Sequence, residues 1–252
     1  MHLRRNLLAI VAGLAVGLTA AGCSSGSSGS NSTAGAPVAL RLGYFPNVTH
    51  APAIYGLESG AFAKDLGPKV KLSTSVFNAG PNAVTALLSG AIDAAYVGPN
   101  PAISAWTKGK GAAVVVSGVA SGGAFLVVKP SINSAADLKG KKIADPQLNG
   151  TQDIALRWYL QQHGYKTDAT GGGDVHVVPQ ENAQTLTAFK TGDIDGAWVP
   201  EPWATRLVTE GGGKVLVDER DLWPGGQYVT TQLVVSRKFL DAHPDVVKRL
   251  LE

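Results

Sequence analysis

The chain has 252 residues, of which 44% are hydrophobic and 16% are charged. This length is enough for two small lobes with their own cores or for one large domain. The formal net charge is only +3, and such a balance argues against nucleic-acid binding, which needs a clustered basic surface. Because Cys23 is the single cysteine, an internal disulfide is excluded.

Residues 1–22 have the features of a bacterial lipoprotein signal peptide. Arg4 and Arg5 give a basic start, and the apolar run Leu7–Ala21 is too short to span a membrane comfortably. Cys23 follows directly, so we expect its sulfur to be lipidated and the exported protein to be anchored at the outer face of the cytoplasmic membrane. A plain signal peptide followed by a free thiol is the alternative, and both Sec and twin-arginine export stay open.

Residues 23–36 consist almost entirely of Ser, Gly, Asn, Thr and Ala. Such a composition cannot bury a core and predicts a flexible tether. The folded part of the chain is therefore expected to start near Pro37.

From Pro37 to Lys129 the pattern alternates between strands and helices, which is typical of an α/β fold. The run Ala112–Ser117 is rich in β-branched residues, and we interpret it as a buried parallel strand. Gly60 interrupts a predicted helix near its end. The other predicted elements of this half are, in chain order, a strand at Val38–Tyr44, a helix at Ala51–Ala63, a strand at Val70–Phe77 and a strand at Ala124–Lys129.

The second half of the chain continues this alternation. Thr151 can cap a helix that ends at Gly164. We interpret Tyr228–Val235 as the antiparallel partner of Ala124–Lys129, and this pair as the hinge between two lobes. The remaining predicted elements are a capped turn at Ser134–Gly140, strands at Lys142–Ala144 and Val215–Val217, a turn at Trp223–Gly226 and a helix that starts at Pro244.

One phrase occurs twice in the sequence. The segment Gly90–Val97 returns as Gly192–Val199, and in each copy a strand, an Asn-bearing turn and a short helix precede the glycine. This is the order of a βαβ crossover, so the repeat predicts two similar α/β lobes that hold a ligand between them. Asp93 and Asp195 occupy equivalent places, which favours a shared structural role over an acid and base pair.

The repeat and the hinge interpretation together predict where the lobes begin and end. The last helix reaches Glu252 without a glycine cap or a polar tail, so we expect lobe I to be truncated at its C-terminus. The predicted parts are lobe I, residues 37–123 and 228–252, and lobe II, residues 124–227.

Ligands of open α/β sheets sit beyond the carboxyl ends of the strands, so the loops between a strand and its following helix are the candidates. These segments contain no Lys or Arg. They offer helix N-terminal amides and neutral polar side chains, which suit a permanently ionised head such as a sulfonate. The segments are Tyr44–His50, Asn78–Asn82, Gly98–Pro101, Ser121–Gly123, Leu148–Asp153 and Pro200–Trp203.

Several candidate residues have a second interpretation. Asn78 and Thr151 could serve as helix N-caps, and Glu201 could either meet an ammonium group or bond a backbone amide at a helix start. Trp203 is expected to face the cleft, whereas Trp198 is expected to lie in the core. The candidate ligand-binding residues are Tyr44, Asn47, Thr49, His50, Asn78, Gly80, Asn82, Asn100, Ser121, Gly122, Thr151, Gln152, Glu201 and Trp203.

The sequence lacks the common signatures of enzymes. It has no Gly-x-Ser-x-Gly elbow, no phosphate-binding loop that ends in Lys and Ser or Thr, and no His-Glu-x-x-His. His50 is expected to be a turn or rim residue, because the other histidines are scattered singly along the chain. We therefore expect no catalytic residue, no metal and no cofactor.

Four stretches carry a family resemblance: Gly43–Pro52, Asn78–Pro81, Asp137–Ala144 and Val199–Trp203. They resemble substrate-binding proteins of ABC importers, specifically the aliphatic-sulfonate, nitrate and taurine group with the type II periplasmic-binding fold. The resemblance extends from Leu40 to Leu251. It implies an α/β fold of two lobes, each a mostly parallel sheet flanked by helices, which are joined by two hinge strands.

The resemblance also implies what the protein works with. We expect a small organic anion as ligand, preferably an aliphatic sulfonate, and an ABC permease complex as partner of a monomeric, lipid-anchored protein. Alternatives within the fold are nitrate, taurine or a thiamine-type pyrimidine as the solute. Alternatives of another class are a pyrimidine-forming enzyme on the same fold and a surface lipoprotein without a solute.

Overall fold

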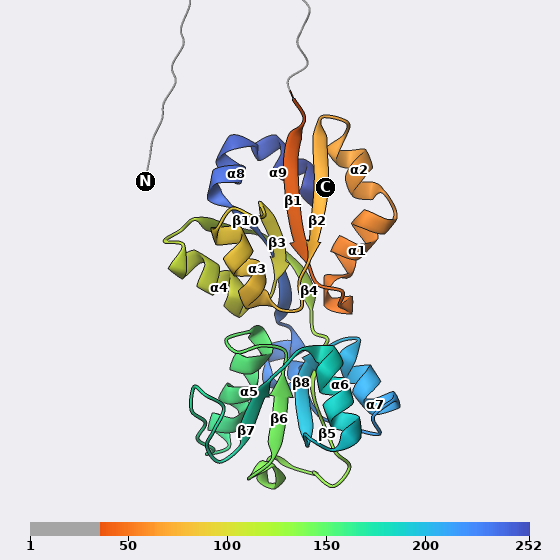
Figure 1. Ribbon diagram of the computed structural model, residues 1–252, viewed down its shortest axis with the longest axis vertical. Coiled ribbons are helices and arrows are strands. Elements are labelled where there is room, and N and C mark those ends of the chain that lie inside the picture. The colour runs from red at the N-terminus through yellow and green to blue at the C-terminus, as the bar shows by residue number, and fades with distance from the viewer. Residues whose placement is uncertain (1–35) are drawn as a thin grey trace, which may run out of the picture. The chain divides into compact units, whose positions relative to one another are not determined.

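The structure is a computed structural model that describes residues 36–252 (Figure 1). The predicted signal peptide, the predicted lipidation site Cys23 and almost all of the predicted tether lie outside the described residues. Within residues 36–252 no helix is both long enough and apolar enough to cross a membrane.

The first sheet has the strand order β2-β1-β3-β10-β4, counted over the described residues. β1 runs parallel to β2 and β3, and β10 runs antiparallel to β3 and β4. We call this sheet and its helices lobe I. Its strands are β1 (Val38–Tyr44), β2 (Val70–Val76), β3 (Ala94–Val97), β4 (Ala113–Ser121) and β10 (Val229–Ser236).

Helices cover both faces of the first sheet (Figure 1). On one face α1, α2, α8 and α9 pack with β1 around Leu40 and Leu42, and on the other α3 and α4 pack around Ala95 and Val97. Burial on both faces explains why the central strand β3 is a continuous apolar run, whereas the edge strand β2 is polar and mostly exposed. The helices are α1 (Ala51–Glu58), α2 (Ala61–Leu66), α3 (Gly80–Leu88), α4 (Pro99–Lys108), α8 (Arg237–Ala242) and α9 (Pro244–Leu251), with a 3-10 turn η1 (Val48–His50) before α1.

The second sheet, which with its helices we call lobe II, has the equivalent strand order β7-β6-β8-β5-β9. β6 is parallel to β7 and β8, and β5 is antiparallel to β8 and β9. Trp198 fills one of its cores, as expected. The strands are β5 (Ala124–Val128), β6 (Lys142–Asp145), β7 (His176–Pro179), β8 (Gly196–Pro200) and β9 (Lys214–Asp218). The helices are α5 (Thr151–Gln162), α6 (Asn182–Thr191) and α7 (Trp203–Thr209), with 3-10 turns η2 (Ala135–Leu138), η3 (Glu219–Leu222) and η4 (Pro224–Gly226).

The repeated phrase performs the same structural task in both lobes. The Asp93 carboxylate accepts the backbone N–H of Arg41 at 2.9 Å, and the Asp195 carboxylate accepts that of Lys142 at 2.9 Å. In return the backbone N–H of each aspartate donates to the carbonyl of the same strand residue at 2.8 Å. Each aspartate thus fixes the entry of the last strand of its crossover, β3 or β8, against the neighbouring strand of the sheet, β1 or β6, which confirms the predicted structural role.

Two predictions about strands are wrong. The run Ala112–Ser117 belongs to β4, an edge strand that is antiparallel to β10, and Val115 within it is 49% exposed. The predicted hinge pair of Ala124–Lys129 with Tyr228–Val235 does not form, because β5 and β10 belong to different sheets.

The chain crosses between the lobes beside the β4–β10 pair instead. This pair extends to Ser121, immediately before the outbound crossing, and to Val229, immediately after the return crossing. The outbound crossing uses Gly122 and Gly123, whose φ angles of 75° and 81° suit glycine. The backbone N–H of Gly122 approaches the Tyr228 carbonyl of the return crossing at 3.4 Å. The runs at Ala124–Lys129 and Tyr228–Val235 are similar in composition, and each contains the strand that follows a crossing, β5 or β10. Their composition did not reveal that they pair with strands of different sheets.

Candidate functional site

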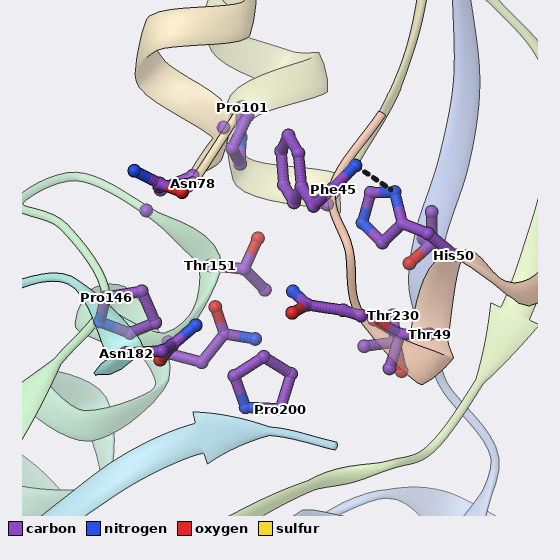
Figure 2. Close-up of a pocket in the computed structure, with 17 residues that line it drawn as sticks. Phe45, Thr49, His50, Asn78, Pro101, Pro146, Thr151, Asn182, Pro200 and Thr230 are labelled. Atoms are coloured by element: carbon purple, nitrogen blue, oxygen red, sulfur yellow. Dashed lines mark hydrogen bonds between the residues drawn. The ribbon is translucent and has the colours of Figure 1, made fainter. Parts of the chain in front are cut away.

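A small pocket lies where loops from both lobes meet (Figure 2). The pocket has a cavity volume of about 30 Å³, so it can enclose only a compact group. The described residues that line it are Phe45, Asn47, Thr49, His50, Asn78, Ala79, Gly80, Gly98, Pro101, Pro146, Gly150, Thr151, Gln152, Asn182, Pro200, Thr230 and Thr231.

Half of the predicted site residues line this pocket, and the other half lie elsewhere. Those in the pocket are Asn47, Thr49, His50, Asn78, Gly80, Thr151 and Gln152. Those outside its lining are Tyr44, Asn82, Asn100, Ser121, Gly122, Glu201 and Trp203. The first group comes from loops that follow parallel strands, as the strand-end rule requires.

Four helices of the described chain start at the pocket. Gly80 and Asn182 are the first residues of α3 and α6, Thr151 is the first residue of α5, and Gly98 precedes α4. In none of these four does a side chain cap the N-terminus. The first backbone N–H groups of a helix lack partners within the helix and carry its positive dipole end, so the pocket is suited to an anion. Pro81 in α3 and Pro99 in α4 have no N–H, so fewer donors come from these two helices than from α5 and α6.

The alternative interpretation of Asn78 and Thr151 as N-caps is wrong. The N-cap of α3 is Ala79, and the Asn78 side chain donates to Glu181 at 2.6 Å instead. The N-cap of α5 is Gly150, with an extended backbone, and Thr151 lies one residue inside the helix. Both side chains therefore lie at helix starts without serving the helix backbone.

Two further polar groups in the pocket were not predicted. The side-chain oxygens of Asn182 and Thr231 are buried and have no hydrogen-bond partner among the described residues. Leaving such groups unsatisfied costs about 1–3 kcal/mol each. A bound anion would offset that cost for the Thr231 hydroxyl, which can donate, whereas the amide oxygen of Asn182 can only accept and needs a donor such as an ammonium group. Asn182 occupies the helix position in the second repeat that Gly80 occupies in the first, so the repeat could have identified it. Thr231 lies on β10, for which the loop rule gives no indication.

The lining of the pocket is electrically neutral. No Lys, Arg, Asp or Glu of residues 36–252 belongs to it. Burial lowers the pKa of the His50 imidazole to about 3, so the ring is uncharged in ordinary conditions, and His50 is a buried wall residue rather than a rim residue. Its Nδ1 accepts the backbone N–H of Phe45 at 3.3 Å, a bond that Figure 2 shows as a dashed line.

Hydrogen bonds between the lobes surround the pocket. Besides the bond from Asn78 to Glu181, Gln147 donates to Asn82 at 3.0 Å and the Trp203 indole donates to Asn47 at 3.2 Å. The backbone N–H of Val48 donates to the Glu201 carbonyl at 3.0 Å. These contacts join loops of lobe I to loops of lobe II, so the described state is one in which the cleft is closed. Asn82 and Trp203 therefore do not line the pocket, but each forms a hydrogen bond between the lobes beside it.

Glu201 takes the structural alternative predicted for it. Its carboxylate accepts the backbone N–H of Thr205 at 3.1 Å and the Thr205 hydroxyl at 2.9 Å, at the start of α7. Among the described residues no group of three His, Cys, Asp or Glu side chains is placed to hold a metal ion.

The closed cleft depends on glycine where α4 and α5 begin. A Cβ atom on Gly98 would lie 2.0 Å from Oγ1 of Thr151, which no side chain tolerates. The two helix starts can therefore approach each other only because residue 98 is glycine.

Comparison with known proteins places this geometry in context. The profile of the NMT1-like family matches residues 33–252. The taurine-binding periplasmic protein of Escherichia coli K12 is 32% identical over 198 residues, which are 78% of this chain and 59% of that protein. The putative aliphatic sulfonates-binding protein of the same organism is 30% identical over 197 residues, which are 76% of this chain and 58% of that protein. The chain thus spans less than two thirds of the length of these relatives.

Solved structures show the same fold. The alkanesulfonate-binding protein SsuA of Xanthomonas axonopodis pv. citri, bound to MOPS, matches with a TM-score of 0.71 and 23% identity over 85% of this chain and 71% of that one. The nitrate-binding protein NrtA of Synechocystis PCC 6803 matches with a TM-score of 0.72 and 22% identity over 85% and 60%. These matches confirm the predicted periplasmic-binding fold. The two relatives from Escherichia coli are named as binding proteins, which agrees with the prediction of a binding protein rather than an enzyme.

Proposed function

The chain belongs to the NMT1-like family, and on that premise we propose that it is the solute-binding component of an ABC importer. We propose further that it captures a small organic anion, preferably a short aliphatic sulfonate, between its two lobes. The protein makes and breaks no covalent bond in this role.

One observation carries the proposal: a pocket shared by both lobes collects four helix starts of the described chain and no charged side chain. A sulfonate keeps its charge at every ordinary pH, so it needs no proton donor and no fixed countercharge. It does need each oxygen hydrogen-bonded once water has left. Backbone N–H groups and neutral side chains such as Thr151 and Gln152 provide this.

The size of the pocket bears on the choice of solute. Its small volume favours methanesulfonate, ethanesulfonate or taurine over long-chain sulfonates. The names of the two relatives, a taurine-binding and a putative aliphatic sulfonates-binding protein, support the same class. Nitrate is the second candidate, because it is also a compact anion without an ionisable proton. A pyrimidine would need flat aromatic walls, and only Phe45 and His50 supply rings to the described lining.

Closure follows from contacts that exist only when the lobes meet. Thr49 and Gly80 belong to lobe I, whereas Thr151 and Asn182 belong to lobe II. A ligand that bonds to both sides favours the closed state over the open one, and binding shifts that equilibrium. We propose that an ABC permease complex recognises the closed form, that the protein acts outside the cytoplasm as a monomer, and that a lipid on Cys23 holds it at the membrane.

The test is thermal unfolding of the lipid-free protein with methanesulfonate, ethanesulfonate, taurine, nitrate, bicarbonate and a pyrimidine. A ligand at about one hundred times its dissociation constant should add roughly 2.7 kcal/mol to the free energy of unfolding. We expect this increase with at least one of the short sulfonates. If no anion increases the free energy of unfolding, the proposal is contradicted. If only nitrate increases it, nitrate and not a sulfonate is the solute.

A further inference from the structure

Two buried carboxyl groups lie directly behind the anion pocket. Asp145 ends β6 and has no exposed surface, and Asp153 in the first turn of α5 is 1% exposed. The residues beside them in sequence, Pro146 and Gln152, both line the pocket. Carboxylates in this place are unexpected, because negative charge close to an anion site opposes binding.

The hydrogen bonds of the pair are incomplete. Oδ1 of Asp145 accepts the backbone N–H of Gln147 at 3.0 Å, and Oδ2 has no partner among residues 36–252. Asp153 accepts the backbone N–H of Asn149 at 2.8 Å and Nε of Arg157 at 2.7 Å. The negative charge of Asp153 acts on Asp145. Two carboxylates can only accept, so a bond between them requires one proton.

The titration of the pair agrees with this geometry. Burial, and then the negative charge of Asp153, raise the pKa of Asp145 to about 7. Near neutral pH the pair therefore exists partly with and partly without the shared proton. With the proton, Asp153 and Arg157 balance each other and the group is neutral. Without it, one negative charge stays behind the pocket.

Other charged groups near Asp145 do not compensate for its negative charge. From α5 only Asp153 and Arg157 act on it. The adjacent strand β8 (Gly196–Pro200) has no ionisable side chain, and His176 on β7 is exposed at the opposite end of β6, beside Lys142. Glu181, which precedes α6, is exposed and bonded to Asn78, and Lys190 lies in the last turn of α6.

We propose that Asp145 and Asp153 form a proton-binding site that is coupled to the anion pocket, so that binding of an anion is accompanied by uptake of one proton. The inference rests on the proposed function, because it assumes that an anion occupies the pocket. A bound anion stabilises the protonated pair, and the protonated pair in turn stabilises the bound anion.

The sign of the pH dependence follows from this coupling. Below about pH 6 the pair already holds its proton, and the affinity for an anion does not change with pH. Above pH 7 each anion must bring a proton with it, so the dissociation constant rises by up to about tenfold per pH unit. The rise ends where the pair no longer takes up a proton in the complex.

The test is isothermal titration of the full chain with methanesulfonate at pH 8 in two buffers of different ionisation enthalpy. Methanesulfonate does not titrate in this range, so any proton taken up belongs to the protein. We expect uptake of between one half and one proton per bound anion. In Asp145→Asn, which keeps the shape of the protonated acid, uptake should fall to zero and the affinity at pH 8 should rise several-fold.

Asp193→Asn is the matched control, because Asp193 is an exposed aspartate of lobe II whose side chain bonds only to Thr191 among the described residues. It should leave proton uptake unchanged. Binding of methanesulfonate by the unaltered chain without proton uptake overturns the inference and leaves the proposed function standing. Failure of every anion to bind contradicts the proposed function itself, so the two failures are distinguishable. The measurement on the unaltered chain does not depend on the folding of any variant.

Discussion

Neutral groups at helix starts can hold an anion without a countercharge, and Thr151 is the residue where this is easiest to test. It lines the pocket as the first residue of α5. Thr151→Ala should raise the dissociation constant for methanesulfonate about tenfold, because one hydrogen bond to a charged group is worth roughly 1.5–3 kcal/mol. Titration calorimetry measures the change.

Ser121→Ala is the control for this substitution. Ser121 belongs to the predicted set but lies exposed at the end of β4, outside the pocket lining. It should change the dissociation constant less than twofold. Equal losses in the two variants would show that the ligand lies elsewhere.

Substitution of Thr231 should weaken binding without lowering the stability of the fold. Its buried hydroxyl has no partner in residues 36–252, so Thr231→Val should leave the free energy of unfolding unchanged or raise it by up to about 1 kcal/mol. Affinity for methanesulfonate should nevertheless fall several-fold. Chemical denaturation and calorimetry test the two effects separately, with the exposed Thr187→Val as control. A loss of stability without a loss of affinity would mean that the hydroxyl serves the fold.

Buried carboxyl groups also predict how stability depends on pH. Burial raises the pKa of Glu219 to about 7, and burial followed by Asp153 does the same for Asp145. Both groups hold a proton more tightly in the folded chain than in the unfolded one. Their contribution is therefore fully present below pH 4 and is lost as pH rises through about 7.

The melting temperature should accordingly be lower at pH 8.5 than at pH 6 at constant ionic strength. In Asp145→Asn this difference should shrink, because an amide loses nothing when the pH rises. Calorimetric scans between pH 5 and 9 measure it. A melting temperature that rises across this range would show that neither carboxyl group is protonated in the folded state.

At the scale of elements, the starts of α4 and α5 are in close contact across the two lobes. Gly98→Ala would place a Cβ atom 2.0 Å from Oγ1 of Thr151. We expect the lobes to fold as before but to close poorly, so affinity for methanesulfonate should fall at least tenfold with little change in melting temperature.

Gly118→Ala is the matched control for this wedge. Gly118 lies on the edge strand β4, and an added Cβ would meet nothing within 4 Å. Its effect on affinity should be less than twofold. If Gly98→Ala also binds normally, closure does not bring these two helix starts together.

The elements themselves follow from local sequence patterns, whereas their partners do not. The alternating pattern at Val38–Tyr44 and the repeated βαβ phrase predict their strands and helices correctly, because side chains alternate between the faces of a strand and the inner strands of each repeat are buried. Whether Ala124–Val128 pairs with β8 and β9 or with β10 depends on long-range contacts that composition does not encode. The error in the hinge pair has this origin.

At the scale of the molecule, the site is predictable to the extent that it follows from strand ends. Asn47, Gly80 and Thr151 lie in the loops that the parallel strands point to, and the structure brings them together. Thr231 was not predicted because it lies within the antiparallel strand β10, whereas the strand-end rule considers only the loops that follow parallel strands. Ser121, in contrast, is exposed at the end of β4 and does not belong to the pocket lining.

The central claim is that neutral donors from both lobes hold the anion, and a crystal structure of the protein with methanesulfonate tests it most directly. The account predicts the sulfonate between the starts of α3, α5 and α6, with its oxygens bonded to backbone N–H groups and to neutral side chains of both lobes. A sulfonate that binds outside this pocket, or that is held by Lys or Arg side chains, would contradict the account.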